Sequence, residues 1–522
     1  MAHDILLARL ELHPFSRAPE ILRYLLYNGK MSTPVVTRFA PSPTGFQHIG
    51  GVRTALYAWA WARKNDGTFI LRIEDTDKER EVPGSIEHVM ELLRWLGLEW
   101  DFGPDKPGSF GPCIQSQRLD TYMKAAHELI AKGLAYPDPY SAEEIDAFRK
   151  AAETEKRPFL FRDHRPAQFD TWDGTRPLRF KVPEIKRYKW HDEVRGDLEA
   201  GEEALDDFIL MKSDGYPTYN FAHIIDDMHM GVTHIMRADE FISSTPKFLS
   251  LYEGLGIVPP KFVTLPPILR EDKTKKLGKR DGAKDALEYR TEGYLPDAFI
   301  NALAMIGWNP GGDQEIFSRD ELIATFDISG IQTHGGVFNE EKLRWFNREY
   351  LLHMTTDEFS AYTMPTLKEA LIERGITDMD ATIAQKLLPV IHERISTSND
   401  LRAMVGEGEF DYYFKKPILD VTKIPFKGGS PTDTVKHLQH VKETFVKSSE
   451  DQFKDPENIK SLIWDYATEV GRGGVLWPLR YALTGAERSP DPFTVISIIG
   501  LAETLARIDA AGDLLEASGV ST

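Results

Sequence analysis

Residues 35–51 read VVTRFAPSPTGFQHIGG, and they combine the pattern of a buried strand with a proline-containing loop and the start of a helix. The β-branched and aromatic residues at the beginning suit a central strand, and Pro41 and Pro43 then force the chain out of the sheet. Apolar residues recur at helical spacing beyond residue 51, so His48 is expected just before a helix N-terminus, where free N–H groups favour phosphate. The glycines that let the backbone come close to a ligand are Gly45, Gly50 and Gly51. The stretch therefore predicts a nucleotide site in an α/β fold.

Four more motifs follow in order along the chain. They are RIEDTD at residues 72–77, GYPTYNFA at 215–222, HIMRADE at 234–240 and KLGKR at 276–280. HIGG at His48 resembles the HIGH box of class I aminoacyl-tRNA synthetases, KLGKR resembles their KMSKS loop, and TRFAPSPTG narrows the likeness to the glutamyl-tRNA synthetases. The resemblance runs from about residue 37 to the C-terminus. It implies activation of L-glutamate with ATP to glutamyl-adenylate and transfer of the glutamyl group to the 3′ end of tRNA for translation.

The resemblance also implies an α/β Rossmann-like class I catalytic domain with an inserted α+β acceptor-end-binding domain, followed by an all-α anticodon-binding domain. The catalytic domain is expected at residues 31–102 and 213–265. Glycine and proline cluster from residue 103 onward and strand-like segments follow, so the insertion is placed at 103–212. The KLGKR loop belongs to a stem-contact region at 266–336. Beyond it strand signals fade and apolar residues recur at helical intervals, which predicts a helical domain at 337–522.

The first thirty residues precede the resemblance and mix arginines with acidic residues, which suits neither a secretory signal nor a transit peptide. Residues 1–30 are therefore predicted to be an extension of unknown role. Because Met31 stands directly before the first strand, a misassigned start codon is a second hypothesis. Mass spectrometry of the native N-terminus distinguishes the two.

Composition limits the partners and the compartment. The chain has a formal net charge of -18, which argues against a general nucleic-acid binder, so any contact with RNA must be local. Cys113 is the only cysteine in the sequence, which excludes an intramolecular disulfide and fits a reducing compartment. No apolar run reaches the roughly 18 residues that a membrane span requires. We expect a cytoplasmic monomer with no membrane partner.

The resemblance implies two groups of site residues. The ATP-binding group comprises Gly45, His48, Gly50, Gly51, Lys276 and Lys279, of which His48, Lys276 and Lys279 would be catalytic, with Mg²⁺ accompanying ATP. The glutamate-binding group comprises Arg38, Ala40, Ser42, Glu74, Tyr219, His223 and Arg237. Glutamate brings two carboxylates and one ammonium, and two arginines with one glutamate match that pattern of charge. Which arginine takes which carboxylate stays open at this point.

Three features depart from the family pattern. Gly278 replaces the usual serine of the second loop, so we expect slower activation without loss of function. His223 stands where the family commonly has asparagine, and an uncharged histidine still donates one hydrogen bond. Some relatives hold a zinc ion with cysteines in the insertion, but residues 136–140 and 162–165 contain no cysteine here, so no zinc is expected. His164, in the second of these segments, is interpreted as an ordinary surface or hydrogen-bonded histidine.

Arg394 falls near the place of an anticodon-reading arginine in the family, although an exposed helix arginine would explain it equally well. Three other functions compete with the main interpretation: glutamylation of a modified tRNA base, nucleotidyl transfer to a small molecule through an HxGH box, and RNA binding by a catalytically silent paralogue. The first two need no anticodon half, yet the sequence after residue 336 exceeds one typical domain of about 100 residues. The intact charged motifs disfavour the third. The acceptor is tRNA for glutamate, either alone or together with tRNA for glutamine.

Overall fold

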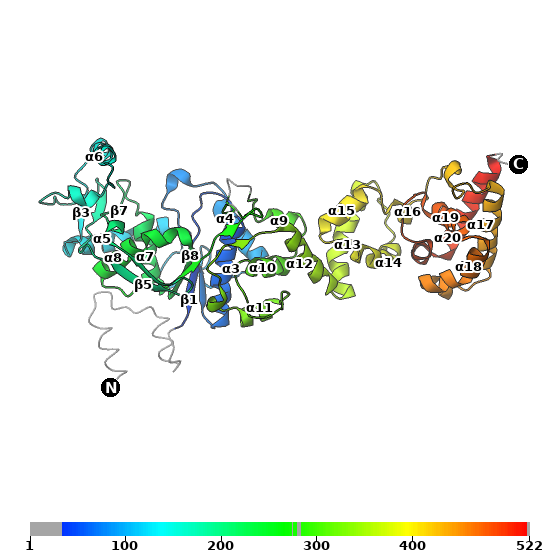
Figure 1. Ribbon diagram of the computed structural model, residues 1–522, viewed down its shortest axis with the longest axis horizontal. Helices are drawn as coiled ribbons and strands as arrows, with labels where there is room; N and C mark the ends of the chain where they lie inside the picture. Colours follow the sequence, from blue (N-terminus) through cyan, green and yellow to red (C-terminus); the bar gives the residue numbers. More distant parts are fainter. Residues whose placement is uncertain (1–33, 274, 279–282, 519–522) are drawn as a thin grey trace, which may run out of the picture. The chain divides into compact units, whose positions relative to one another are not determined.

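The computed structural model describes residues 34–273, 275–278 and 283–518 (Figure 1). The predicted extension at 1–30, Met31 and Lys279 lie outside these residues. The chain divides into two compact units. The first ends at Phe346, and the second begins at Asn347 and also takes in Glu292–Tyr294.

The first unit is organised around a strand, helix and strand that follow each other in the chain. β1 (Val36–Phe39) pairs in parallel with β2 (Thr68–Leu71), in the register Val36↔Thr68 to Phe39↔Leu71. Two parallel neighbours need a long crossover, and α3 (Ile49–Lys64) supplies it. Ten of the helix's residues are buried, so α3 is packed on most of its circumference. The predicted nucleotide-site stretch therefore folds as the strand, loop and helix that its sequence indicates.

A second parallel pair adjoins the first. β8 (His234–Ala238) pairs in parallel with β9 (Lys261–Leu265), in a sheet ordered β6-β5-β9-β8 that also contains β5 (Tyr188–Asp192) and β6 (Gly196–Ala200). Thr233, directly before β8, exchanges hydrogen bonds with Val36 of β1. The helices that flank β8 in sequence are α7 (Tyr219–His229) and α8 (Thr245–Leu255).

The residues between the two parallel pairs form a small antiparallel sheet with helices beside it. Its order is β3-β4-β7, with β3 (Ala135–Pro137), β4 (Leu178–Phe180) and β7 (Ile209–Met211). The accompanying helices are α5 (Leu119–Ala131) and α6 (Ala142–Thr154). One buried apolar cluster contains residues of β1, β2, α5, β4, α7 and α8, so this region shares its core with the parallel strands.

Short helices and strands complete the first unit. They are α4 (Ser85–Trp95), β10 (Ile268–Leu269), α9 (Glu288–Thr291), α10 (Pro296–Ala304), α11 (Arg319–Thr325), β11 (Gly336–Val337) and α12 (Glu340–Leu352), the last of which continues into the second unit. Arg53 of α3 donates hydrogen bonds to the carbonyls of Pro266 and Ile306, which ties these later segments to the nucleotide-site helix.

The second unit is helical. Its helices are α13 (Thr356–Glu373), α14 (Ala381–His392), α15 (Ser398–Gly406), α16 (Asp411–Phe414), α17 (Pro431–Val446), α18 (Pro456–Val470), α19 (Arg472–Thr484) and α20 (Pro492–Ala517). No strand occurs between residues 347 and 518, all of which the structure describes. The all-α prediction for this part of the chain is confirmed. Among the described residues, no helix is long and apolar enough to cross a membrane.

Candidate active site

The first signature loop positions His48 as the N-cap of α3. The backbone of His48 is extended, and its Nδ1 accepts a hydrogen bond from the N–H of Gly50 at 3.0 Å. Because Nδ1 is the acceptor, a neutral imidazole carries its proton on Nε2, where it can be donated to an anion. A Cβ at position 50 would lie 2.8 Å from His48 Cε1, and a Cβ at position 51 would lie 2.4 Å from Gln47 Oε1. A side chain at position 50 would therefore displace the His48 ring, whereas at position 51 the flexible Gln47 side chain can move aside.

This geometry makes Gly50→Ala a specific test of the loop. The added methyl displaces the His48 ring from its cap, and we expect the rate of glutamate activation to fall by about 10²-fold, as for loss of one charge-stabilising donor. Gly312→Ala is the matched control, because a Cβ at Gly312 meets nothing within 4 Å. Rates of ATP-dependent charging measure both variants, and a parent-like rate for Gly50→Ala would contradict the assignment.

The predicted glutamate-binding residues at the ends of β1 and β2 are adjacent. The N–H of Arg72 donates to the carbonyl of Phe39 at 2.9 Å, and the N–H of Glu74 donates to the carbonyl of Pro41 at 3.0 Å. The loop that carries Ala40 and Ser42 therefore runs alongside Glu74. Burial raises the pKa of Glu74, and the neighbouring Arg72 and Arg38 oppose that rise. A substrate ammonium placed here would favour the ionised carboxylate further.

Arg38 is already paired inside the protein. Its Nε lies 3.1 Å from Asp227 Oδ1, and Asp227 also accepts from Arg72 Nη1 at 2.6 Å. Arg72 in turn donates to Glu74 Oε1 at 2.8 Å. All four side chains are at most 5% exposed. Burial alone would raise the pKa of Asp227, but Arg38 and Arg72 outweigh it and lower that pKa to about 2.

The neighbouring carboxylate, Asp226, holds a second set of partners. It accepts hydrogen bonds from Arg118 Nε at 2.7 Å, from Gln115 Nε2 at 2.8 Å and from the hydroxyl of Tyr122 at 2.8 Å. The sequence interpretation missed Arg72, Arg118 and the role of both aspartates. The two consecutive acids in a helical pattern were the only local signal for this network.

Arg237, near the end of β8, differs from Arg38 in having no acidic partner. It is 6% exposed and forms an ion pair with none of the described residues. Its Nη2 donates to Thr245 Oγ1 at 3.0 Å, whereas Nη1 is buried without a hydrogen-bond partner in the described part of the chain. The guanidinium carbon lies 4.9 Å from the ring centre of Phe248 and 5.1 Å from that of Phe262. Burial lowers the pKa of Arg237. An unpaired buried cation of this kind provides a strong attraction for an anion.

Tyr219 and His223 lie one turn apart at the start of α7, close to Arg237. Their rings stack at 4.6 Å, and both pack against Phe248, which Arg237 also contacts. Burial raises the pKa of Tyr219 to about 12, so the phenol stays neutral and can act as a donor. The structure thus brings together every predicted glutamate-binding residue around β1, β2, β8 and the N-terminus of α7.

The second signature loop lies next to the first. Leu277 N–H donates to the carbonyl of Ile268, and Lys276 Nζ lies 2.5 Å from Glu240 Oε2, just beyond β8. After the loop, Ala286 N–H donates to the carbonyl of Gln47 at 2.9 Å, and Asp285 pairs with His88 Nε2 at 2.8 Å. The segment that follows the second loop is therefore bonded directly to the first loop. The predicted partner of Lys276, Lys279, falls outside the described residues.

The two insertion segments in which no cysteine occurs, residues 136–140 and 162–165, are joined by hydrogen bonds. The hydroxyl of Tyr140 donates to the carbonyl of His164 at 2.7 Å, and the His164 ring stacks on Phe148 at 4.0 Å. Tyr136 and Arg165 meet on the same carboxylate, Asp207, at 2.7 Å and 2.5 Å. Within the described residues, no group of three or more His, Cys, Asp and Glu side chains could hold a metal ion.

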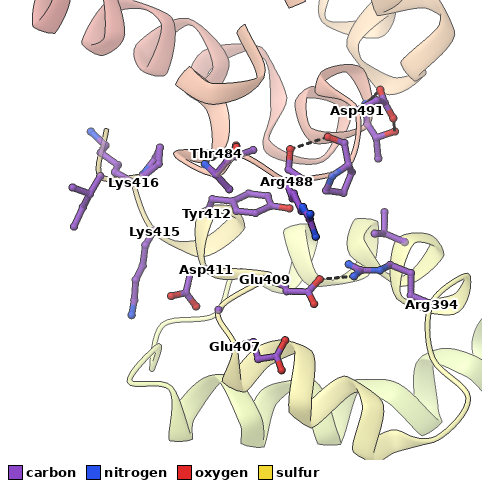
Figure 2. A pocket seen from close by; sticks show the side chains of 18 of the residues that line it. Arg394, Glu407, Glu409, Asp411, Tyr412, Lys415, Lys416, Thr484, Arg488 and Asp491 are labelled. Atoms are coloured by element: carbon purple, nitrogen blue, oxygen red, sulfur yellow. Dashed lines mark hydrogen bonds and ion pairs between the residues drawn. The ribbon is translucent and has the colours of Figure 1, made fainter. Parts of the chain in front are cut away.

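Arg394, in the second unit, lines a cavity of about 1070 Å³ (Figure 2). Its guanidinium pairs with Glu409 across the cavity wall. Other charged side chains that line the cavity are Glu393, Glu407, Asp411, Lys415, Lys416, Arg488 and Asp491. Arg394 is therefore neither an isolated surface arginine nor an unpaired one.

The parallel strands, the histidine cap and the adjacent basic loop define a class I aminoacyl-tRNA synthetase. Residues 34–345 match the family model of the catalytic domain of class I tRNA synthetases (E and Q), and residues 352–512 match an anticodon binding domain. A glutamate–tRNA ligase of Clostridium botulinum (strain Okra / Type B1) is 38% identical, over 93% of this chain and 100% of the relative. A glutamate–tRNA ligase of Anaeromyxobacter sp. (strain Fw109-5) is 38% identical, over 91% of this chain and 98% of the relative. The crystal structure of a glutamate tRNA ligase from Elizabethkingia meningosepticum, in complex with its amino acid, superposes with a TM-score of 0.81 at 35% identity, covering 92% of this chain and 100% of that chain.

The chain belongs to the glutamate–tRNA ligase family. It is an ATP-dependent aminoacyl-tRNA ligase, and its substrates are glutamate and tRNA. The anticodon-domain match argues against the two alternative enzymes that need no anticodon half.

Proposed function

We propose that the side chains gathered between β1, β2, β8 and α7 bind L-glutamate for attack on ATP, with Arg237 taking the side-chain carboxylate. The observation that supports this most strongly is the unpaired Nη1 of Arg237, buried among aromatic rings. Arg38 is the less suitable partner for that carboxylate, because Asp227 already occupies its Nε edge. Glu74 takes the ammonium, with Ala40 and Ser42 beside it. Tyr219 and His223 complete the site.

Activation then depends on positioning and on neutralising charge. The glutamate α-carboxylate attacks the α-phosphate, and negative charge grows on the phosphate oxygens. His48 Nε2–H and the N-terminus of α3, with Gly45, Gly50 and Gly51 allowing close approach, would stabilise that charge from one side. Lys276 must leave Glu240 to act from the other side, where Lys279 is its proposed partner. Mg²⁺ would bind mainly through the ATP phosphates and neutralise part of their charge, since no described side-chain cluster offers a protein-only metal cage.

The acceptor is proposed to be tRNA for glutamate, and the protein a cytoplasmic monomer that binds no zinc. The decisive test is transfer of labelled glutamate, with ATP and Mg²⁺, onto separate transcripts of tRNA for glutamate and tRNA for glutamine. Charging of the first alone supports the proposal, and charging of both indicates a misacylating enzyme that needs an amidotransferase downstream. Charging of neither, with ATP still bound, would refute the proposal in favour of a silent paralogue.

Arg394 is proposed to contact tRNA from its cavity in the second unit. We expect Arg394→Ala to raise KM for tRNA by about tenfold, the order of one charge-assisted hydrogen bond on a partly exposed group, with kcat little changed. Arg402→Ala is the matched control, because Arg402 also pairs with a glutamate in this unit but does not line the cavity. Equal KM values for the two variants in the charging assay would show that Arg394 has no role in tRNA binding.

A further inference from the structure

His223 is a neutral histidine whose single ring proton already forms a hydrogen bond within the protein. Its Nδ1 lies 2.7 Å from the carbonyl oxygen of Tyr219, and a carbonyl can only accept, so Nδ1 carries the proton. Burial lowers the pKa of His223 to about 3, and the nearby Arg237 and Arg38 also disfavour the charged ring. The remaining nitrogen, Nε2, therefore presents a lone pair. This differs from the sequence interpretation, in which the histidine would donate its one hydrogen bond to the substrate.

That lone pair has no partner, and the ring cannot turn to find one. Nε2 is buried without a hydrogen-bond partner among the described residues. The imidazole is held between Tyr219, stacked at 4.6 Å and 17°, and Phe248, packed edge-on at 4.7 Å and 77°. The guanidinium of Arg237 also packs against the ring of Phe248. Its Nη1 is the buried donor that has no hydrogen-bond partner among the described residues. An unsatisfied acceptor and an unsatisfied donor thus belong to two side chains that pack against the same phenylalanine, at one corner of the proposed glutamate site.

A carboxylate can satisfy only one of these two groups. It accepts from Arg237, but it offers no proton to Nε2, and a lone pair facing a carboxylate oxygen is repulsive. An amide would satisfy both groups, because its oxygen accepts from arginine and its NH₂ donates to histidine. A carboxylate satisfies both only if one proton is placed between it and Nε2. The chain nevertheless belongs to a family of glutamate ligases, so the proton must be supplied when the acidic side chain binds.

We infer that His223 takes up one proton from solvent on Nε2 when the side-chain carboxylate of glutamate enters, and that this protonated ring then donates to the carboxylate. The inference rests on the proposed glutamate site. It makes His223 a residue that determines specificity between the acid and its amide. Acidification strengthens glutamate binding, because bound enzyme holds one more proton than free enzyme. Binding of glutamine, which donates to neutral Nε2, does not change with pH.

Titratable and charged groups surround His223 on several elements. They are Tyr219 and Asp227 on α7, Arg237 on β8, Arg38 on β1, Tyr252 on α8 and Tyr122 on α5. The hydroxyl of Tyr122 is bound to Asp226, and β7 contains no titratable side chain. Asp227 is held ionised by its two arginines, and the buried tyrosines stay neutral. Glu74, whose pKa burial raises, also acts electrostatically on Tyr219, and it is the proposed partner of the substrate ammonium. His223 is therefore the group in this corner that can gain a proton when the side-chain carboxylate binds.

The test is calorimetry of glutamate binding to the full-length protein at pH 6.5 in MES, ACES and imidazole buffers, whose different ionisation enthalpies separate proton uptake from the binding heat. We expect uptake approaching one proton per glutamate for the parent and for His229→Asn, a control on the same helix whose pKa is also lowered. His223→Asn should bind glutamate with no uptake, and His223→Gln serves if the first variant fails to fold. In charging assays, KM for glutamate should rise by up to about tenfold for each unit of pH increase in the parent, and it should not change with pH in His223→Asn. The inhibition constant of glutamine should not change with pH in either protein.

Two results would overturn the inference: uptake below about a tenth of a proton in a parent that binds glutamate, or the same uptake in His223→Asn as in the parent. A parent that neither binds nor transfers glutamate would instead refute the proposed site, and the inference with it. The charging assay distinguishes that case from failure of the inference alone.

Discussion

Replacing Arg237 with methionine is expected to abolish glutamate charging while leaving the melting temperature unchanged or higher. Arg237 has no acidic partner among the described residues, so the free protein pays for a buried charge that only a ligand compensates. Loss of one partner of a buried charge pair costs about 3–5 kcal/mol, which corresponds to about 10²–10⁴-fold in kcat/KM for glutamate. Methionine fills a similar volume among the aromatic rings without a charge.

Two measurements check this prediction together: steady-state charging at varied glutamate, and thermal unfolding without ligands. The control is Arg187→Met, which removes an exposed arginine paired with Glu199 and should change neither quantity. KM for ATP should also be unaffected in Arg237→Met. A variant that loses activity because its melting temperature falls would show that Arg237 is a structural residue, contrary to the assignment.

Asp227→Asn is expected to show the opposite combination, with a large loss of stability. Asp227 is the common partner of Arg38 and Arg72, and an amide in its place leaves the buried guanidinium of Arg38 without a counter-charge and removes one of the two close carboxylates of Arg72, which keeps Glu74. Breaking a buried pair on one side costs about 3–5 kcal/mol. Asp197→Asn, at an exposed carboxylate that pairs only with His191, is the control for the same chemical change. A melting temperature equal to the parent's would refute the structural role of Asp227.

The same carboxylate gives a prediction on pH. The pKa of Asp227 is lowered to about 2 from its ordinary value of 3.8, so the ionised form stabilises the fold above the ordinary value. That contribution is lost as the pH falls from about 4 toward 2. The difference in stability between the parent and Asp227→Asn should therefore be constant near neutral pH and shrink across this acidic range.

Local sequence patterns were sufficient for the framework of the site. The β-branched and aromatic residues and the prolines of residues 35–43 marked the strand and the turn out of it, and the position of His48 followed from the helical spacing beyond it. Such signals depend on neighbours within a few residues, so they are visible without the fold.

The charge pairing was not predictable in the same way. Arg72 and Asp227 are 155 positions apart, and nothing in RIEDTD says that its arginine, and not only its glutamate, is a buried part of the site. The Nδ1 contact of His223 spans only four residues, and the spacing was present in the sequence. Its consequence still required the structure, because a lone pair on Nε2 matters only where burial excludes water. Arg394 is exposed, as its sequence context suggested, but its pairing with Glu409, fifteen residues away, was not predictable from the sequence.

The links between the two insertion segments affect how this region folds. Tyr140 with His164, and Tyr136 with Arg165 on Asp207, join the segments through groups that belong to the chain itself. A metal-bridged loop pair must capture an ion before it is complete, so the rate at which it refolds depends on the free metal concentration. Here the donors and the acceptors of these hydrogen bonds all belong to the polypeptide, so no added ion is needed to form them. Refolding of this segment should therefore proceed at one rate in a chelator and in a zinc-containing buffer.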